Sequence, residues 1–216
     1  MRLLGLDVGT TGCKAAIFEM DGAPVASARR EYGVSMPKPT WAEQDAERVW
    51  VLARDAMREA IAAAGGEPIV AVGLSVQGEA IIPVDTNGAA LRQAILGMDT
   101  RTTAQNAWLR ANFGARRLFD RTGMPVHTIN TLPKLLWLRE HELPLWQAAD
   151  RFLLYEDYII GKMTGVYAIS RCLASRTQLY DLGVDAWSDE ILDIVGLDRL
   201  RLSPVLPSGT AVEMMK

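Results

Sequence analysis

The feature that most constrains the fold is a glycine-bounded turn between two apolar runs near the start of the chain. The stretch LDVGTTGCK joins an apolar run that ends at Asp7 to a second run that leads from Cys13 to Phe18. A third run, 24–31, follows the turn MDGAP. Short apolar runs separated by glycine-containing turns are typical of antiparallel strands. We therefore expect three strands, at 3–7, 13–18 and 24–31, in an antiparallel meander.

Beyond these strands the apolar spacing becomes helical. From Asp45 the apolar residues recur at intervals of three and four up to the Gly-Gly pair at 65–66, which predicts a helix between these points. The run IVAVGLSV at 69–76 follows this helix directly, so we expect a buried strand parallel to the first one. Shorter strands are expected at 81–84, 94–96 and 152–154, and further helices at 102–112, 132–141, 157–163 and 188–195.

Three antiparallel strands, a helix and a parallel strand follow the order of the ribonuclease-H-like fold, which actin and hexokinase-type sugar kinases share. The order therefore indicates an α/β fold class, an actin-like ATPase domain with a mixed sheet flanked by helices. One such fold serves many functions, so the function has to be argued from the residues of a site.

Composition excludes several classes of function. The chain has 216 residues and a net charge of -3, with 23 basic residues scattered among 26 acidic ones, whereas a nucleic-acid groove needs clustered Lys and Arg. The first residues reach Asp7 too soon for a signal peptide or a membrane span. Cys13 and Cys172 lie far apart in aliphatic segments, which favours reduced thiols. We expect a cytoplasmic protein with neither nucleic acid nor membrane as a partner.

The Gly-Thr-Thr-Gly turn has the composition of an anion-binding loop. Gly9 and Gly12 permit positive φ, so that backbone N–H groups can turn outward together. Asp7 is suited to hold a hydrated Mg²⁺ that bridges phosphate oxygens. The candidate phosphate-binding or ATP-binding residues are Gly9, Thr10, Thr11, Gly12 and Lys14. The alternative is a tight β-turn that Asp7 caps, with Lys14 in solvent.

The same hairpin, GLDVGTTGCKAAIFEMDG, resembles the first phosphate loop of the FGGY carbohydrate kinases. The segments at 41–50, 69–101 and 121–165 are similar, in the same order, to further segments of that family. A last segment, LASRTQLYDLGVDAWSDEIL at 173–192, also resembles the family. Because these segments cover nearly the whole chain, the sequence is identified as a member of the FGGY family, similar to its xylulose and gluconate kinases.

The resemblance implies phosphorylation of a hydroxyl on a sugar, sugar acid or polyol, with ATP and Mg²⁺ as cofactors, in a cleft between two actin-like domains. Such chemistry rests on positioning and charge neutralisation, while a carboxylate base takes the hydroxyl proton. In this family the base is an aspartate in a Gly-Gly-Asp type motif of the second domain, and this chain has no such motif. We therefore expect residues 1–216 to be the substrate-side N-terminal domain, with 101–190 as the family's helical and substrate-loop insertion.

The resemblance implies a C-terminal kinase domain as the main partner of the chain. That domain would carry the adenosine pocket and the base beyond Lys216, so the 216 residues alone are expected to be inactive. Family members commonly form dimers, so a homodimer is a further expectation. The alternative is a stand-alone, non-catalytic sugar-binding or regulatory module. The ordered sugar-loop motifs disfavour an actin-like or chaperone-like ATPase.

By resemblance, the substrate loop follows the strand at 69–76, at the carboxyl end where open α/β sheets place ligands. The alternatives are structural: Glu79 as a solvated loop residue, Asp99 and Arg101 as an ion pair, and Lys134 as an exposed helix lysine. The residues expected to bind the substrate are Gln77, Gly78, Glu79, Asp99, Arg101, Asn130 and Lys134.

Two positions depart from the family pattern. Many xylulose and gluconate kinases carry a Met-His-Gly type tripeptide in the substrate loop, whereas Glu79 is closer to the Arg-Glu usage of glycerol-kinase-like members. Gly97 stands where the family usually has Trp. Glycine in place of tryptophan removes a large side chain from the expected substrate pocket, which favours a bulkier or differently shaped substrate.

Overall fold

The structure, a computed structural model, describes residues 1–212 and divides the chain into two compact units. Unit 1 comprises Met1–Val34 and Gln44–Gln77, and unit 2 comprises Ser35–Glu43 and Gly78–Lys216. Two short strands, β4 (Glu43–Gln44) and β7 (Ala94–Ile95), pair with each other. No helix in residues 1–212 has the length and apolar character needed to cross a membrane.

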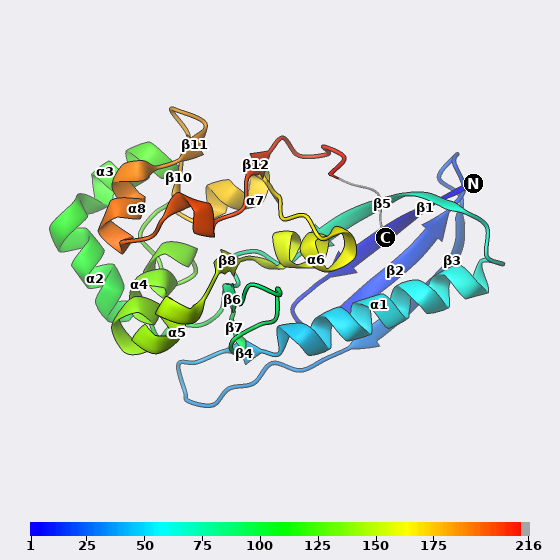
Figure 1. Ribbon diagram of the computed structural model, residues 1–216, viewed down its shortest axis with the longest axis horizontal. Helices are drawn as coiled ribbons and strands as arrows, with labels where there is room; N and C mark the ends of the chain where they lie inside the picture. Colours follow the sequence, from blue (N-terminus) through cyan, green and yellow to red (C-terminus); the bar gives the residue numbers. More distant parts are fainter. Residues whose placement is uncertain (213–216) are drawn as a thin grey trace. The chain divides into compact units, whose positions relative to one another are not determined.

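Unit 1 is a mixed four-stranded sheet with one long helix (Figure 1). Strands β1 and β2 pair antiparallel, as do β2 and β3, and β5 runs parallel to β1. The order across the sheet is β3-β2-β1-β5. The strands are β1 (Arg2–Val8), β2 (Gly12–Phe18), β3 (Pro24–Glu31) and β5 (Ile69–Val76). The predicted meander and the parallel strand after the helix are therefore confirmed.

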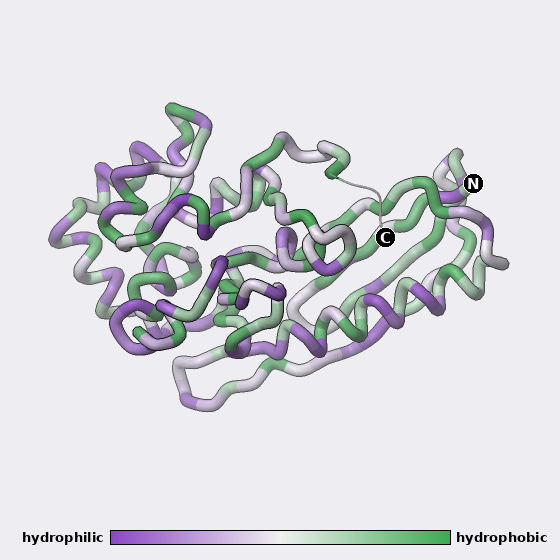
Figure 2. Tube along the Cα trace, viewed as in Figure 1, coloured by the Kyte–Doolittle hydropathy of each residue, from purple (hydrophilic) through white to green (hydrophobic). Residues whose placement is uncertain are grey.

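Helix α1 (Ala46–Ala63) covers one face of this sheet. Asp45 caps its N-terminus by accepting a hydrogen bond from Arg48 N at 3.0 Å. The helix ends before Gly65 and Gly66, which both have positive φ. Figure 2 shows hydrophobic and hydrophilic residues alternating along α1, as expected for a helix with one buried face. The helix predicted between Asp45 and the Gly-Gly pair is confirmed.

The burial predicted for the strand at 69–76 is wrong. We expected a buried strand, but β5 lies at the edge of the sheet with β1 as its neighbour. Val70 is 50% exposed, and Ala71, Gly73 and Ser75 are also exposed. A continuous apolar run indicates a strand, but the order of strands in the sheet decides how much of it is covered.

Unit 2 is mostly helical. Its short strands pair as β6 (Ile82–Val84) with β8 (Arg151–Leu153), β10 (Tyr180–Asp181) with β11 (Ala186–Trp187), and β9 (Ile169–Ser170) with β12 (Val205–Leu206). Its helices are α2 (Thr103–Leu109), α3 (Ala115–Thr122), α4 (Thr131–His141), α5 (Leu143–Ala148), α6 (Tyr155–Thr164), α7 (Arg171–Arg176) and α8 (Asp189–Val195), with a π-helical segment η1 (Arg110–Gly114) and a 3₁₀ turn η2 (Arg199–Arg201). The helices expected at 102–112, 132–141, 157–163 and 188–195 correspond to α2 with η1, α4, α6 and α8. Helices α3, α5 and α7 were not predicted.

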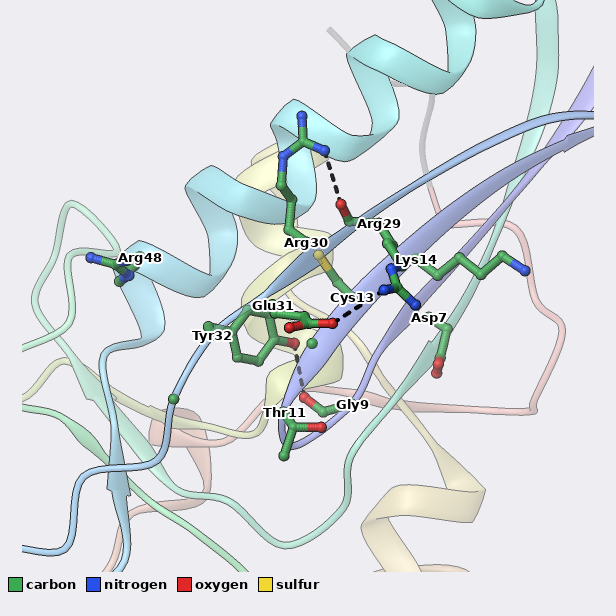
Figure 3. Close-up of a pocket in the computed structure, with 12 residues that line it drawn as sticks. Asp7, Gly9, Thr11, Cys13, Lys14, Arg29, Arg30, Glu31, Tyr32 and Arg48 are labelled. Atoms are coloured by element: carbon green, nitrogen blue, oxygen red, sulfur yellow. Dashed lines mark hydrogen bonds and ion pairs between the residues drawn. The ribbon is translucent and has the colours of Figure 1, made fainter.

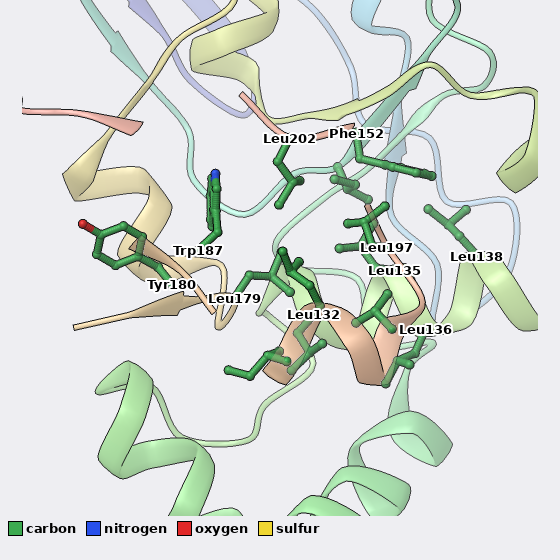
Figure 4. Packing of buried hydrophobic residues seen from close by; sticks show 14 of the residues in the cluster. Leu132, Leu135, Leu136, Leu138, Phe152, Leu179, Tyr180, Trp187, Leu197 and Leu202 are labelled. Carbon is green, nitrogen blue, oxygen red and sulfur yellow. The ribbon is translucent and has the colours of Figure 1, made fainter. Parts of the chain in front are cut away.

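A hydrophobic core lies among these helices (Figure 4). Helix α4 contributes Leu132, Leu135, Leu136 and Leu138, all nearly inaccessible to solvent. Because this helix is buried on several sides, its apolar residues do not form one stripe. The aromatic and aliphatic residues around it in Figure 4 are Phe152, Leu179, Tyr180, Trp187, Leu197 and Leu202.

The buried side chain of Asp157 forms hydrogen bonds at the N-terminus of α6. Its Oδ1 accepts from Leu154 N at 2.7 Å, and its Oδ2 accepts from Ser203 Oγ at 2.6 Å. Burial raises the pKa of Asp157 to about 7, although both hydrogen bonds act in the opposite direction. The carboxyl group therefore keeps its proton in the folded protein at pH values where the unfolded chain has lost it.

We expect this group to make the protein less stable as the pH rises from about 4 to about 7. Over that range the folded state binds the additional proton, so the free energy of unfolding falls by up to a few kcal/mol. Asp157→Asn keeps an acceptor for Leu154 N and removes the titration. Urea unfolding at pH 5 and pH 8 should show a smaller pH dependence in the variant, with the variant the more stable at pH 8. An equal pH dependence in both proteins would contradict this assignment.

Candidate functional site

The Gly-Thr-Thr-Gly turn forms the tip of the β1–β2 hairpin. Gly9 N donates to Gly12 O at 2.9 Å and closes the turn. Neither glycine has positive φ, so our expectation of that backbone conformation is wrong. Glycine is needed instead for close approach: a Cβ on Gly12 would lie 2.7 Å from Arg30 O, and a Cβ on Gly9 would lie 3.3 Å from Gly12 O.

Tyr32 holds two carbonyl groups of this turn. Its hydroxyl donates to Gly9 O at 2.8 Å, and its backbone N–H donates to Thr11 O at 3.0 Å. Burial raises the pKa of the Tyr32 phenol, so the hydroxyl remains a donor at neutral pH. Within residues 1–212 no hydrogen bond occupies the N–H of Thr10 or Thr11. The turn thus directs its carbonyl groups toward protein donors and leaves two N–H groups for an anion.

Two glutamines brace the same turn. Gln44 Nε2 donates to Thr10 O at 2.8 Å. Gln77 Nε2 donates to Gln44 Oε1 at 2.8 Å and to Gly9 O at 3.3 Å. Gln77, expected to bind the substrate, therefore hydrogen-bonds to the phosphate-loop candidate in unit 1. Gln44 was not predicted, and its only signal in the sequence was its place in the segment at 41–50.

An open pocket of about 820 Å³ lies beside the hairpin (Figure 3). The candidate residues Asp7, Gly9, Thr11, Gly12 and Lys14 line it, together with Tyr32 and three arginines. Asp7 faces Lys14 across the β1–β2 pair, and Lys14 faces Arg29 across the β2–β3 pair. Glu31 also lines the pocket and pairs with Arg29 at 3.5 Å. The pocket therefore combines two carboxylates with several cations and, within residues 1–212, the unbonded N–H groups of the turn.

The Asp7 carboxylate is exposed and has no hydrogen bond or ion pair within residues 1–212. It does not cap the turn, which was the structural alternative. Mg²⁺ is usually held by one or two carboxylates, several waters and substrate phosphates. A single unpartnered carboxylate beside an anion-binding turn fits that requirement. Among the described residues no cluster of three acidic, His or Cys side chains offers a richer metal site.

Unit 2 brings together Gly78, Glu79, Gly97 and Ile129. A Cβ on Gly97 would lie 3.4 Å from Gly78 O, 3.6 Å from Ile129 Cγ1 and 3.7 Å from Glu79 Oε2. Glu79 is 3% exposed and has a φ of 59°, which is uncommon for a residue other than glycine. The structure therefore does not match the alternative of a solvated loop residue. Ile129 was not predicted, because the segment singled out in the sequence began one residue later.

Lys134 joins the two segments that flank Gly97. It is completely buried, and its Nζ donates to Glu79 O and to Ile129 O, both at 2.7 Å. Burial lowers the pKa of Lys134 to about 7, with the charges of Glu79 and Asp99 opposing the shift. It is therefore neither an exposed helix lysine nor a side chain open to solvent. Its contacts hold the backbone of the loop that carries Glu79.

Asp99 and Arg101 bind each other, as in the structural alternative. Arg101 Nε donates to Asp99 Oδ1 at 2.9 Å, and its Nη2 donates to Asp99 Oδ2 at 2.7 Å. The same guanidinium pairs with Glu43 at 2.7 Å and lies 3.7 Å from the Trp41 ring centroid. Asp99 Oδ2 also accepts from Ala42 N at 2.6 Å. These contacts anchor the segment Ser35–Glu43 within unit 2.

Asn130 is also directed into the protein. It is fully buried, and its Nδ2 donates to Pro125 O at 2.7 Å. Gln178 Nε2 donates to the same carbonyl at 3.0 Å. Both contacts fix the chain just before α4, which begins at Thr131.

Arg176 is a further residue of this region that we did not predict. It ends α7, and its Nε and Nη2 each lie 2.5 Å from Glu79 Oε1. The residue lies in the segment at 173–192, where we recognised a resemblance but assigned no role. The helix that positions it is only six residues long and has no clear periodicity.

Comparisons with known proteins show the family of the chain. The model for the FGGY family of carbohydrate kinases, N-terminal domain, matches residues 2–216. A glycerol kinase from Gloeobacter violaceus is 34% identical over 209 residues, covering 95% of this chain and 42% of that protein. A xylulose kinase from Klebsiella pneumoniae is also 34% identical over 209 residues, covering 97% of this chain and 43% of that protein. The chain thus spans less than half the length of these curated relatives.

A solved structure shows the same fold. The xylulose kinase from Rhodospirillum rubrum superposes with a TM-score of 0.96 at 26% identity, covering 100% of this chain and 45% of that one. This likeness confirms the predicted α/β, actin-like ATPase fold with a mixed sheet and flanking helices.

Proposed function

Because the chain belongs to the FGGY family of carbohydrate kinases, we propose that the whole protein transfers a phosphoryl group from ATP to a hydroxyl of a sugar, sugar acid or polyol. The observation that carries this proposal is the hairpin tip beside Asp7. Its carbonyl groups are bound by Tyr32, Gln44 and Gln77, while two of its N–H groups and the Asp7 carboxylate have no partner among residues 1–212. Such a turn is suited to the terminal phosphates of a nucleotide.

On the phosphate side, Asp7 would hold Mg²⁺, and Lys14 would add a cation. The metal, when bound, neutralises charge on the phosphate oxygens. The residues proposed to contact phosphate remain Gly9, Thr10, Thr11, Gly12 and Lys14. Gly9, Thr11, Gly12 and Lys14 line one pocket, and within residues 1–212 no hydrogen bond occupies the N–H of Thr10 or Thr11, which supports this assignment.

On the acceptor side, Glu79 offers a carboxylate oxygen suited to sugar hydroxyls. The absence of a side chain at Gly97 leaves Glu79 Oε2 approachable, because any Cβ there would lie 3.7 Å from that oxygen. This supports acceptors longer than three carbons. Gly78 and Ile129 would border them. Lys134, Asp99, Arg101 and Asn130 would act by holding the loops, given their contacts to protein groups.

The catalytic base is proposed to lie in sequence beyond Lys216, as an aspartate of a C-terminal kinase domain. The 216-residue chain alone would then bind an acceptor without phosphorylating it. We further propose a cytoplasmic location, with no membrane or nucleic-acid partner, and a homodimer as the assembly. The free thiols of Cys13 and Cys172 are compatible with a reducing compartment.

The test is an ADP-release assay on the protein expressed from the complete open reading frame. Acceptors should include glycerol, four- to six-carbon polyols, pentuloses, hexuloses and aldonic acids, each with ATP and Mg²⁺. We expect ADP release that depends on one acceptor class, with a phosphate monoester detected by ³¹P NMR. The matched control is the 216-residue chain, which should release no ADP.

The possible outcomes separate the alternatives. Turnover by the 216-residue chain alone would contradict the proposed division of the site. Binding of an acceptor without turnover by the complete protein would favour a non-catalytic sugar-binding module. A complete protein that neither binds nor phosphorylates any acceptor would overturn the proposed function.

A further inference from the structure

We propose that Arg176 is a positioning residue that holds the Glu79 carboxylate so that Oε2 alone meets the acceptor. The inference rests on the proposed function and assigns a role to Arg176, which that function leaves without one. Its starting point is the asymmetry of the Glu79 contacts. Both Arg176 nitrogens, Nε and Nη2, bind Oε1 at 2.5 Å. Within residues 1–212 no donor binds Oε2, which faces the space at Gly97.

The carboxylate needs such a partner because it is buried. The Glu79 side chain is only 5% exposed, and a buried carboxylate without a cation or donors is costly. Arg176 satisfies it by directing two N–H groups and its positive charge at Oε1, which holds that oxygen in place. Because one oxygen is occupied, the other is left for a hydroxyl donor at a defined position.

The Arg176 side chain passes close to the backbone at Gly78, where a larger residue would contact it. A Cβ at that position would lie 3.3 Å from Arg176 Nε and 4.0 Å from Arg176 Cδ. The φ of Gly78 is not positive, so its backbone conformation does not require glycine. The close approach of the Arg176 side chain explains the glycine instead.

Arg176 is itself held by the backbone that follows it. Thr177, the next residue, is fully buried, and its carbonyl accepts from Leu132 N at 3.0 Å. The Thr177 hydroxyl donates to Ala174 O at 2.6 Å. These bonds tie the end of α7 to the start of α4, so the origin of the Arg176 side chain is fixed. Its guanidinium end is nonetheless reachable, because 46% of the side chain is exposed.

The test compares Arg176→Ala and Arg176→Lys with wild type in the complete protein. Arg171→Ala is the matched control, because Arg171 lies in the same helix and forms an exposed ion pair with Asp185. We expect Arg176→Ala to raise the KM for the acceptor about 10- to 100-fold, as the misplaced carboxylate no longer orients it. The kcat and the KM for ATP should stay within about twofold. The acceptor KM of Arg176→Lys should lie between those of wild type and Arg176→Ala, because the single nitrogen of lysine cannot replace both Nε and Nη2.

Chemical rescue separates positioning from a general structural role. Guanidinium added to Arg176→Ala should lower the acceptor KM again, since the vacated site opens to solvent, and should leave Arg171→Ala unchanged. An unchanged acceptor KM in both Arg176 variants would overturn this inference alone. So would a joint loss of kcat, ATP affinity and thermal stability that guanidinium does not reverse. A wild-type protein that binds no acceptor would overturn the proposed function and this inference with it.

Discussion

Replacing Asp7 with asparagine should lower the kcat of the complete protein in the proposed phosphoryl transfer roughly 10²- to 10³-fold, a loss typical of removing one group that stabilises transition-state charge. The carboxylate makes no hydrogen bond or ion pair within residues 1–212, so the substitution removes charge and metal affinity without disturbing a protein contact. Asparagine keeps the size of the side chain. The Mg²⁺ concentration needed for half-maximal activity should rise at the same time.

Steady-state kinetics at several Mg²⁺ concentrations, together with thermal unfolding, check this result. Asp55→Asn is the control, because Asp55 is a partly exposed aspartate of α1 in the same unit and forms an ion pair with Arg54 at 3.5 Å. It should leave both kcat and the Mg²⁺ requirement unchanged. Wild-type turnover by Asp7→Asn would remove Asp7 from the site.

Gly12→Ala should destabilise the protein by about 1–3 kcal/mol, the usual cost of forcing an extra carbon into a closely packed position. The added Cβ would lie 2.7 Å from Arg30 O, a backbone atom of the neighbouring strand, so β2 and β3 would have to separate. The hairpin tip would move with them, and nucleotide affinity should fall as well.

The control for this variant is Gly33→Ala. An added Cβ at Gly33 meets nothing within 4 Å, and its φ is not positive, so the stability should change by only a few tenths of a kcal/mol. Urea unfolding of both variants measures the difference. Equal stability of the two would show that the hairpin accommodates a side chain at Gly12.

Much of unit 1 could be predicted from the sequence because its signals are local. The alternation of strand residues, the cap at Asp45 and the glycine pair at 65–66 depend on neighbours within a few positions. The same local reasoning missed α7, a six-residue helix without a clear apolar period. It also gave the wrong reason for Gly12, because the requirement for glycine comes from Arg30 on another strand.

The candidate site also has one part with a local sequence signal and one part that depends on contacts between distant residues. Asp7 and the Gly-Thr-Thr-Gly turn are contiguous, so their chemistry is visible in nine residues. The partners of Glu79 are separated from it by long stretches of chain: Lys134 is 55 positions away, and Arg176 is 97. No spacing rule connects such residues, and burial, which decides whether a charge needs a partner, is a property of the folded chain.

The sequence by itself determined the order of strands and helices, the hairpin with its acidic residue, and membership of a kinase family, because these follow from local periodicity and contiguous motifs. Only the tertiary structure decided which of the candidate polar residues are bound to protein groups and which are not. It directed Gln77 to the Gly-Thr-Thr-Gly turn and Lys134 to two backbone carbonyls, and it left Asp7 without a hydrogen bond or ion pair among residues 1–212. The physical reason is that a buried polar group must find its hydrogen-bond partner, wherever in the sequence that partner lies.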